Sequence, residues 1–91
     1  MSTKEKYSEE LLLEEEVLKQ NEIVLFNDDV NTFDHVIETL IYACDHMPEQ
    51  AEQCAFITHY KGKCDVKNGV FEELSFMKHQ LDSKGLTVTI E

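Results

Sequence analysis

The chain has 91 residues, enough for one small domain, and 42% of them are hydrophobic, which suffices for a modest core. Its formal net charge is −11 at pH 7 and it has no arginine, so nucleic acid would be repelled and would find no guanidinium groups for its phosphates. No apolar run approaches the roughly 20 residues of a membrane-spanning helix, so we expect neither nucleic acid nor a membrane as a partner.

The first 21 residues form an acidic segment. Glutamates at 9–10 and 14–16 flank the leucines at 11–13, and no core-facing stripe continues for long. We therefore expect residues 1–21 to be a flexible extension and residues 22–91 to be the folded domain. The extension has neither the apolar stretch nor the small-residue cleavage site of a secretion signal, which indicates the cytoplasm.

A short buried strand is predicted at the start of the domain. Residues 23–26 are apolar and rich in strand formers, and the turn-forming run 27–29 (Asn-Asp-Asp) follows them. Asn31 or Thr32 can then cap a helix. The apolar residues of that helix recur at steps of three and four: Phe33, Val36, Ile37, Leu40, Ile41, Cys44 and Met47.

A second helix is predicted to begin at Pro48, which suits the first helical position, and to end at Gly62. Its small side chains share one face: Ala51, Cys54, Ala55 and Thr58. Residues 63–66 are expected to form a short strand, and residues 68–69 (Asn-Gly) are expected to form a turn.

The last two elements are a helix and a strand. Apolar residues mark the third helix at Val70, Phe71, Leu74, Met77 and Leu81. Gly85 is expected to close this helix as a left-handed cap, and residues 86–90 alternate apolar and polar as a half-buried strand does. The predicted fold is α+β, in the order β-α-α-β-α-β, with a small antiparallel sheet packed on three helices.

The cysteines point away from metal or disulfide chemistry. Cys44, Cys54 and Cys64 are odd in number, are spaced by ten and include no CxxC pair. We expect them to be buried free thiols, and we expect no cofactor.

The polar residues most suited to chemistry are Asp28, Asp29 and His59. Carboxylates with a histidine can act as an acid/base or metal site, but no nucleophile with an orienting neighbour accompanies them. The plainer alternatives are a turn held by Asx side chains and a histidine at a helix end. The other histidines fall at polar helix positions and are expected on the surface: His35, His46 and His79.

Three segments together resemble the ClpS family of ATP-dependent Clp protease adaptors. Residues 25–34 are similar to the family's L-N-D-D-x-T-P-M-E segment, and residues 58–63 to its V-H-Y-Q-G-K. Residues 69–71 match the G-V-F that opens the family's third helix. The resemblance runs from Glu22 to the C-terminus, with the three motifs in the family's order.

This resemblance implies a monomeric adaptor that is not an enzyme and that follows the N-end rule. It would bind N-degrons, which combine a free α-amino group with a large hydrophobic first residue such as Phe, Leu, Tyr or Trp. It would deliver them to a ClpA- or ClpC-type AAA+ unfoldase for degradation by ClpP. The amine would be bound by Asn27, Asp28 and His59. The hydrophobic pocket would be formed by Leu25, Asp29, Asn31, Phe33, Val36, Ala55, Thr58 and Leu86.

Some positions depart from the family pattern. Phe33 and Ala55 stand where the family has methionines, so the pocket is expected to be reshaped. The unfoldase would be contacted by Glu73 and Lys78, each one residue before the aligned position. The runner-up function is a non-degradative interaction module, since the C-terminal domain of the ribosomal stalk protein has the same element order. That domain lacks the Asn-Asp-Asp and His-Tyr-x-Gly-Lys motifs, which favours the adaptor.

Overall fold

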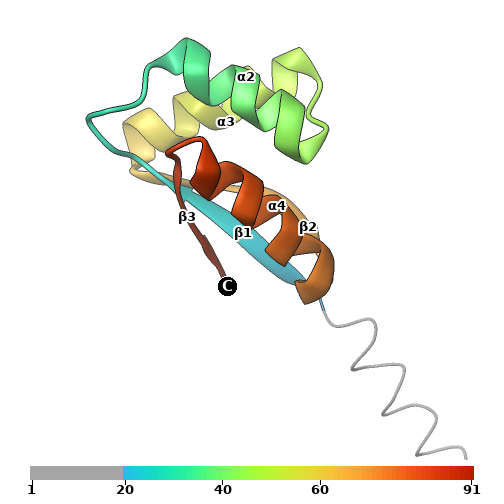
Figure 1. Cartoon of the computed structure of the whole chain (residues 1–91). Coiled ribbons are helices and arrows are strands. Elements are labelled where there is room, and N and C mark those ends of the chain that lie inside the picture. The colour runs from blue at the N-terminus through green and yellow to red at the C-terminus, as the bar shows by residue number, and fades with distance from the viewer. Residues whose placement is uncertain (1–19) are drawn as a thin grey trace, which may run out of the picture.

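The expected α+β fold and its element order are confirmed by the structure, a computed structural model that describes residues 20–91 (Figure 1). The elements are β1 (Asn21–Phe26), α2 (Phe33–Cys44), α3 (Pro48–Lys61), β2 (Lys63–Gly69), α4 (Phe71–Ser83) and β3 (Thr87–Ile90). The first strand begins one residue before Glu22, the expected start of the domain. The flexible extension predicted for residues 1–21 falls almost wholly outside the described residues.

The sheet has the order β2-β1-β3, and both pairings are antiparallel. The apolar run Ile23–Leu25 is buried because β1 is the central strand. The second strand is longer than expected: Asn68 and Gly69 do not form a turn but pair with Glu22 and Asn21. The register shifts by one residue between Ile23 and Val24, because Val66 of β2 is a bulge that has no partner in β1.

The helices divide into two groups. Figure 1 shows α4 lying along the sheet, while α2 and α3 pack on each other at one end of it. Thr32 caps α2, since its hydroxyl accepts the N–H of His35 at 3.1 Å. Side chains from all six elements meet in one core: Ile23, Leu25, Leu40, Ala43, Cys44, Ala51, Cys54, Val66, Leu74, Leu81, Leu86 and Val88.

The loop between α2 and α3 is fastened to β2 by two polar side chains. The expectation that His46 lies on the surface is wrong, because it is 4% exposed and its Nε2–H donates to the carbonyl of Val66. The ammonium of Lys67 donates to the carbonyl of Cys44 at 3.2 Å. His35 is partly buried, and its Nε2–H donates to the carbonyl of Lys84 at 2.7 Å.

The cysteines are free thiols, and two of them, Cys44 and Cys54, are buried, whereas Cys64 is partly exposed. Desolvation raises the pKa of Cys44 to about 11 and that of Cys64 to about 12. Both thiols are therefore protonated at neutral pH.

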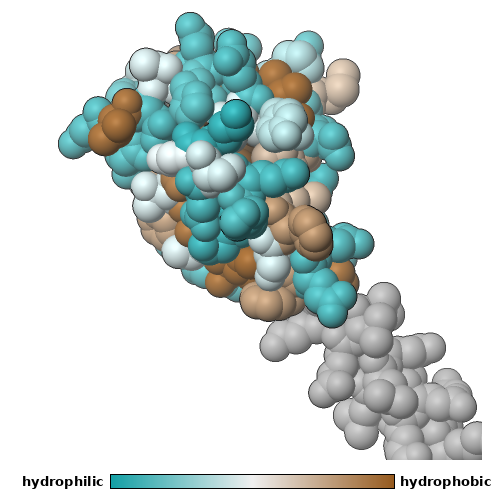
Figure 2. Space-filling model, in the orientation of Figure 1, coloured by the Kyte–Doolittle hydropathy of each residue, from teal (hydrophilic) through white to brown (hydrophobic). Residues whose placement is uncertain are grey.

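One face of the molecule is mostly polar. Figure 2 shows hydrophilic side chains over much of the face formed by α2 and α4, with hydrophobic side chains in smaller patches between them. Among residues 20–91, no helix is long and apolar enough to cross a membrane.

Gly62 connects the end of α3 to the sheet. It adopts a left-handed conformation with φ +93°, and its N–H donates to the carbonyl of Thr58 at 2.9 Å. Its own carbonyl accepts the N–H of Asn27 at 2.9 Å. The next residue, Lys63, starts β2 opposite Phe26 of β1.

We predict that Gly62→Ala lowers the free energy of unfolding by about 1–2 kcal/mol, because a residue with a Cβ is strained at this positive φ. The matched control is Gly69→Ala, whose φ is not positive and whose Cβ would lie 3.4 Å or more from its neighbours. Urea denaturation of both variants measures the difference. An equal loss in the two would show that the conformation of Gly62 is not the cause.

Candidate functional site

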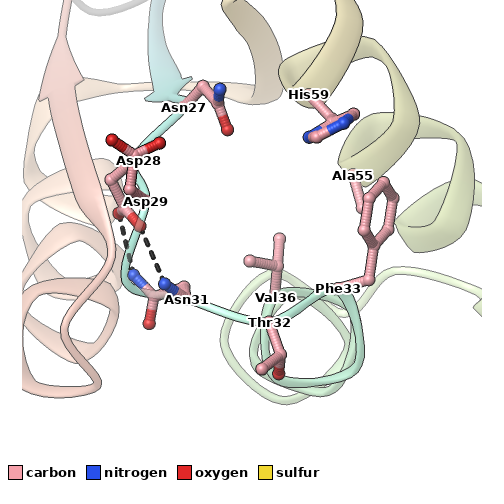
Figure 3. A pocket seen from close by; sticks show the side chains of 9 residues that line it. All are labelled: Asn27, Asp28, Asp29, Asn31, Thr32, Phe33, Val36, Ala55 and His59. Atoms are coloured by element: carbon pink, nitrogen blue, oxygen red, sulfur yellow. Dashed lines mark hydrogen bonds between the residues drawn. The ribbon is translucent and has the colours of Figure 1, made fainter.

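A cavity of about 340 Å³ opens between the end of β1, the start of α2 and the last turns of α3. Nine residues line it, as Figure 3 shows: Asn27, Asp28, Asp29, Asn31, Thr32, Phe33, Val36, Ala55 and His59. A narrower cavity of about 30 Å³ shares four of these residues and lies against the core. It is lined by Leu25, Phe26, Asn27, Asp28, Asn31, Val36, Thr58 and Leu86. The structure thus gathers around these two cavities every residue predicted for the amine site and the hydrophobic pocket.

Asn27 and His59 face the cavity from opposite sides. Figure 3 shows both side chains pointing into the space between β1 and α3. Their positions are coupled through the backbone, since the N–H of Asn27 donates to the carbonyl of Gly62, which caps the helical turn that carries His59. An amide and an imidazole, each able to accept a hydrogen bond, therefore stand at the mouth of the cavity.

Asp28 is held by four donors. Its Oδ1 accepts the N–H groups of Val30 at 3.0 Å and Asn31 at 2.9 Å. Its Oδ2 accepts the side-chain amide of Asn31 at 2.8 Å and the hydroxyl of Thr87 at 3.3 Å. Burial alone would raise the pKa of Asp28, but the backbone and side-chain hydrogen bonds of Asn31, with those of Val30 and Thr87, hold this pKa below its usual value.

These bonds decide how Asp28 can act on a ligand. At neutral pH the side chain is an anion, and its four lone-pair positions are already occupied. A cation in the cavity would be attracted by the charge. A direct hydrogen bond to it would displace the hydroxyl of Thr87, the longest of the four contacts.

Asn31 joins the rim of the cavity to the other end of the chain. Besides binding Asp28, its side-chain amide donates to the carbonyl of Gly85 at 2.9 Å. Gly85 adopts φ +84° in the turn between α4 and β3. The loop after β1 is therefore braced against the turn before β3.

The interior of the site is apolar. Ala55 is 4% exposed, and Thr58 satisfies its own hydroxyl by donating to the carbonyl of Cys54 at 2.8 Å. At the rim, the ring of Phe33 lies 5.3 Å from the imidazole of His59, centroid to centroid. The site therefore combines hydrogen-bond acceptors and a negative charge at its mouth with hydrocarbon further in.

The two predicted unfoldase contacts lie elsewhere. Glu73 and Lys78 are on α4, and neither lines the two cavities. The ammonium of Lys78 pairs with the carboxylate of Asp82 at 2.7 Å. It also borders a shallow groove of about 410 Å³ that includes Phe71 of α4 and Ile90 of β3.

The alternative metal or acid/base site gains no support from the geometry. Within residues 20–91, no group of three or more His, Cys, Asp or Glu side chains is arranged to hold a metal ion. Asp28 is engaged in the turn after β1, which is the plainer role that Asx residues have after a strand.

The sequence interpretation missed some residues of the site. Thr32 and Phe26 line the cavities, and Thr87 binds Asp28 although 59 residues separate them. The only signal for Thr87 was the alternation of residues 86–90, which predicts a strand but not its neighbour. The antiparallel register that puts Thr87 opposite Phe26 brings its hydroxyl to Asp28.

Comparisons with known proteins agree with this picture. The family model for the ATP-dependent Clp protease adaptor protein ClpS matches residues 17–89. Among solved structures, the chain is similar to Agrobacterium tumefaciens ClpS2 bound to L-phenylalaninamide, with a TM-score of 0.72 and 20% identity. That likeness covers 80% of this chain and 95% of the other, and shows a shared fold. A search of curated proteins gives no match.

We predict that Asp28→Asn destabilises the fold at pH 7 by on the order of 1 kcal/mol, because a charged acceptor of four hydrogen bonds is lost. Since the folded pKa lies below the unfolded value of about 3.9, this stabilisation is present above that value and is lost as pH falls through the folded pKa. The gap between the urea midpoints of wild type and variant should therefore narrow below about pH 4.

The control is Asp29→Asn, whose exposed carboxylate makes no hydrogen bond to another described residue. It should change the midpoint little at either pH. A gap for Asp28→Asn that stays constant down to pH 2 would contradict the role of its charge.

Proposed function

The chain belongs to the ClpS family of ATP-dependent Clp protease adaptor proteins, and from this premise we propose that it binds N-degrons. Its ligand is a protein N-terminus that carries a free α-amino group and a large hydrophobic first residue such as Phe, Leu, Tyr or Trp. The observation that carries the proposal is the placement of Asn27 and His59 on opposite sides of one cavity whose interior is apolar.

The mouth of the cavity suits an ammonium group. An α-ammonium has three N–H donors, and it needs acceptors close together. The side-chain oxygen of Asn27 and an unprotonated nitrogen of His59 supply two of them, and the anionic Asp28 supplies charge beside them. Hydrogen bonds to a charged group contribute about 1.5–3 kcal/mol each.

The interior suits the first side chain. Burying a Phe or Leu side chain contributes roughly 1.5–3 kcal/mol, which the cost of association can cancel. Only the combination of hydrocarbon and ammonium approaches the ~8 kcal/mol of micromolar binding. An internal Phe or Leu has no ammonium and is rejected. The ligand named for Agrobacterium ClpS2, L-phenylalaninamide, has both groups, which supports the proposal.

The second half of the function is delivery. The family description names the ATP-dependent Clp protease, and we propose that this chain hands its cargo to a ClpA- or ClpC-type unfoldase, for degradation by ClpP, in the cytoplasm. The adaptor acts as a monomer and without catalysis of its own. Glu73 and Lys78 on α4 are the proposed unfoldase contacts, and they lie outside the cavity that holds the cargo.

Acetylation of the ligand tests the amine half of the site. A peptide that begins with Phe should bind at least tenfold more tightly than the same peptide N-acetylated, because losing even one charge-assisted hydrogen bond removes about 1.5 kcal/mol or more. Fluorescence anisotropy with labelled peptides measures both affinities. Equal binding of the two peptides would refute the mechanism.

Substitution of His59 tests the amine-binding part of the site by changing the protein instead of the ligand. His59→Ala should weaken binding of the Phe-initiated peptide about tenfold, by loss of one acceptor. The matched control is His79→Ala, an exposed histidine on α4 that lines neither cavity. Circular dichroism verifies that both variants fold. Unchanged affinity in His59→Ala would remove this residue from the site.

A further inference from the structure

Three exposed aromatic rings continue outward from the rim of the cavity. Phe33 is 37% exposed at the rim, Phe56 is 50% exposed and Tyr60 is 71% exposed. The ring centroids of Phe33 and Phe56 lie 5.5 Å apart, and those of Phe56 and Tyr60 lie 5.4 Å apart and nearly parallel, at 27°. We call these three residues the aromatic strip.

The aromatic strip is continuous with the proposed binding site. Phe33 lines the main cavity, whereas Phe56 and Tyr60 lie outside it on α3. The imidazole of His59 lies against both ends of the strip: its ring centroid is 5.3 Å from that of Phe33 and 4.8 Å from that of Tyr60. A chain whose first residue fills the cavity, and which leaves it past Phe33, would have this strip beside it.

Core packing does not account for these rings. Phe56 and Tyr60 are exposed, although burying a large aromatic side chain is the usual source of its stabilising effect. Phe56 and Tyr60 stand four residues apart on α3, and their stacking leaves the outer face of the pair open to a ligand. Such faces attract cations through the ring quadrupole, and the planar guanidinium of arginine stacks on them best.

The charges around the strip favour the same kind of ligand. Glu52 precedes Phe56 by four residues on α3 and so lies on the same helix face. Asp34 follows Phe33 directly, and both carboxylates are exposed. Within the described part of the chain, neither has an ion-pair partner. Lys61 directly follows Tyr60, but it is four residues after Ile57 and so belongs to a neighbouring row of the helix.

We propose that the aromatic strip is a second subsite, which binds an arginine side chain in the two residues that follow the first residue of the cargo. The inference rests on the proposed function and narrows its substrate class to N-termini that have a large hydrophobic residue followed closely by arginine. An extended chain advances about 3.5 Å per residue, so the second and third residues lie within reach of rings spaced 5.4–5.5 Å apart.

Arginine and citrulline peptides test this subsite. Citrulline has nearly the shape of arginine without the charge, so a Phe-initiated peptide with arginine at position two or three should bind roughly two- to fivefold more tightly than its citrulline counterpart. The preference should decrease at high salt. Isothermal titration calorimetry with the full chain measures both affinities.

Variants of the strip assign the effect to its residues. The double variant Phe56→Leu with Tyr60→Leu removes two aromatic faces and keeps apolar bulk, so the ratio of arginine to citrulline affinity should fall toward one. Phe71→Leu, a 59% exposed phenylalanine on α4, is the matched control and should keep the wild-type ratio.

Four outcomes would overturn the inference. Equal affinity of the arginine and citrulline peptides would refute the subsite, while the difference between free and acetylated peptides leaves the proposed function intact. If the double variant kept the wild-type ratio of arginine to citrulline affinity, the aromatic strip would not be the source of the arginine preference. A phenylalanine at position two that binds as tightly as arginine would refute the preference for a cation. Failure of all free-amine peptides to bind would refute the proposed function and this inference together.

Discussion

One backbone hydrogen bond, from the N–H of Asn27 to the carbonyl of Gly62, holds the two halves of the site together. Asn27 follows the central strand, and Gly62 ends the helix whose last turn carries His59. Because Gly62 is left-handed, the chain can turn at once and pair Lys63 with Phe26. The turn at Gly62 thus ends a helix, starts a strand and helps to set the separation between the amide of Asn27 and the imidazole of His59.

A second set of bonds fixes the charge before any ligand arrives. Asp28 receives four donors from Val30, Asn31 and Thr87, and Asn31 also reaches Gly85. Under the proposed function, a carboxylate held in this way would not need to be reoriented when an ammonium enters the cavity, so less of the binding energy would be spent on ordering. Through these bonds the turn at Gly85 and the strand β3 hold the rim of a site that is formed mainly by β1, α2 and α3.

The sequence predicts those parts of the molecule that local pattern determines. The period of apolar residues gives α2, and the Asn-Asp-Asp cluster between a strand end and a helix start gives the rim of the cavity. Contacts between distant segments have no such signal. Nothing near Thr87 indicates its hydrogen bond to Asp28, and nothing near His46 indicates its hydrogen bond to the carbonyl of Val66. The bulge at Val66, which shifts the register between β2 and β1, likewise has no signal in the pattern of residues 63–69.

Phe33 shows how a departure from the family pattern can serve two purposes. The resemblance places methionine here and at Ala55, so this chain has a stiff ring at the rim and a small side chain on the wall behind it. A flexible thioether could fold into the cavity, but the ring of Phe33 is supported from outside by Phe56 and His59. The ring therefore lies against the imidazole proposed to accept from the amine, while Phe56 extends the surface away from the cavity. Under the proposed function, recognition of the first residue and contact with the residues behind it would thus both depend on the position of a single ring.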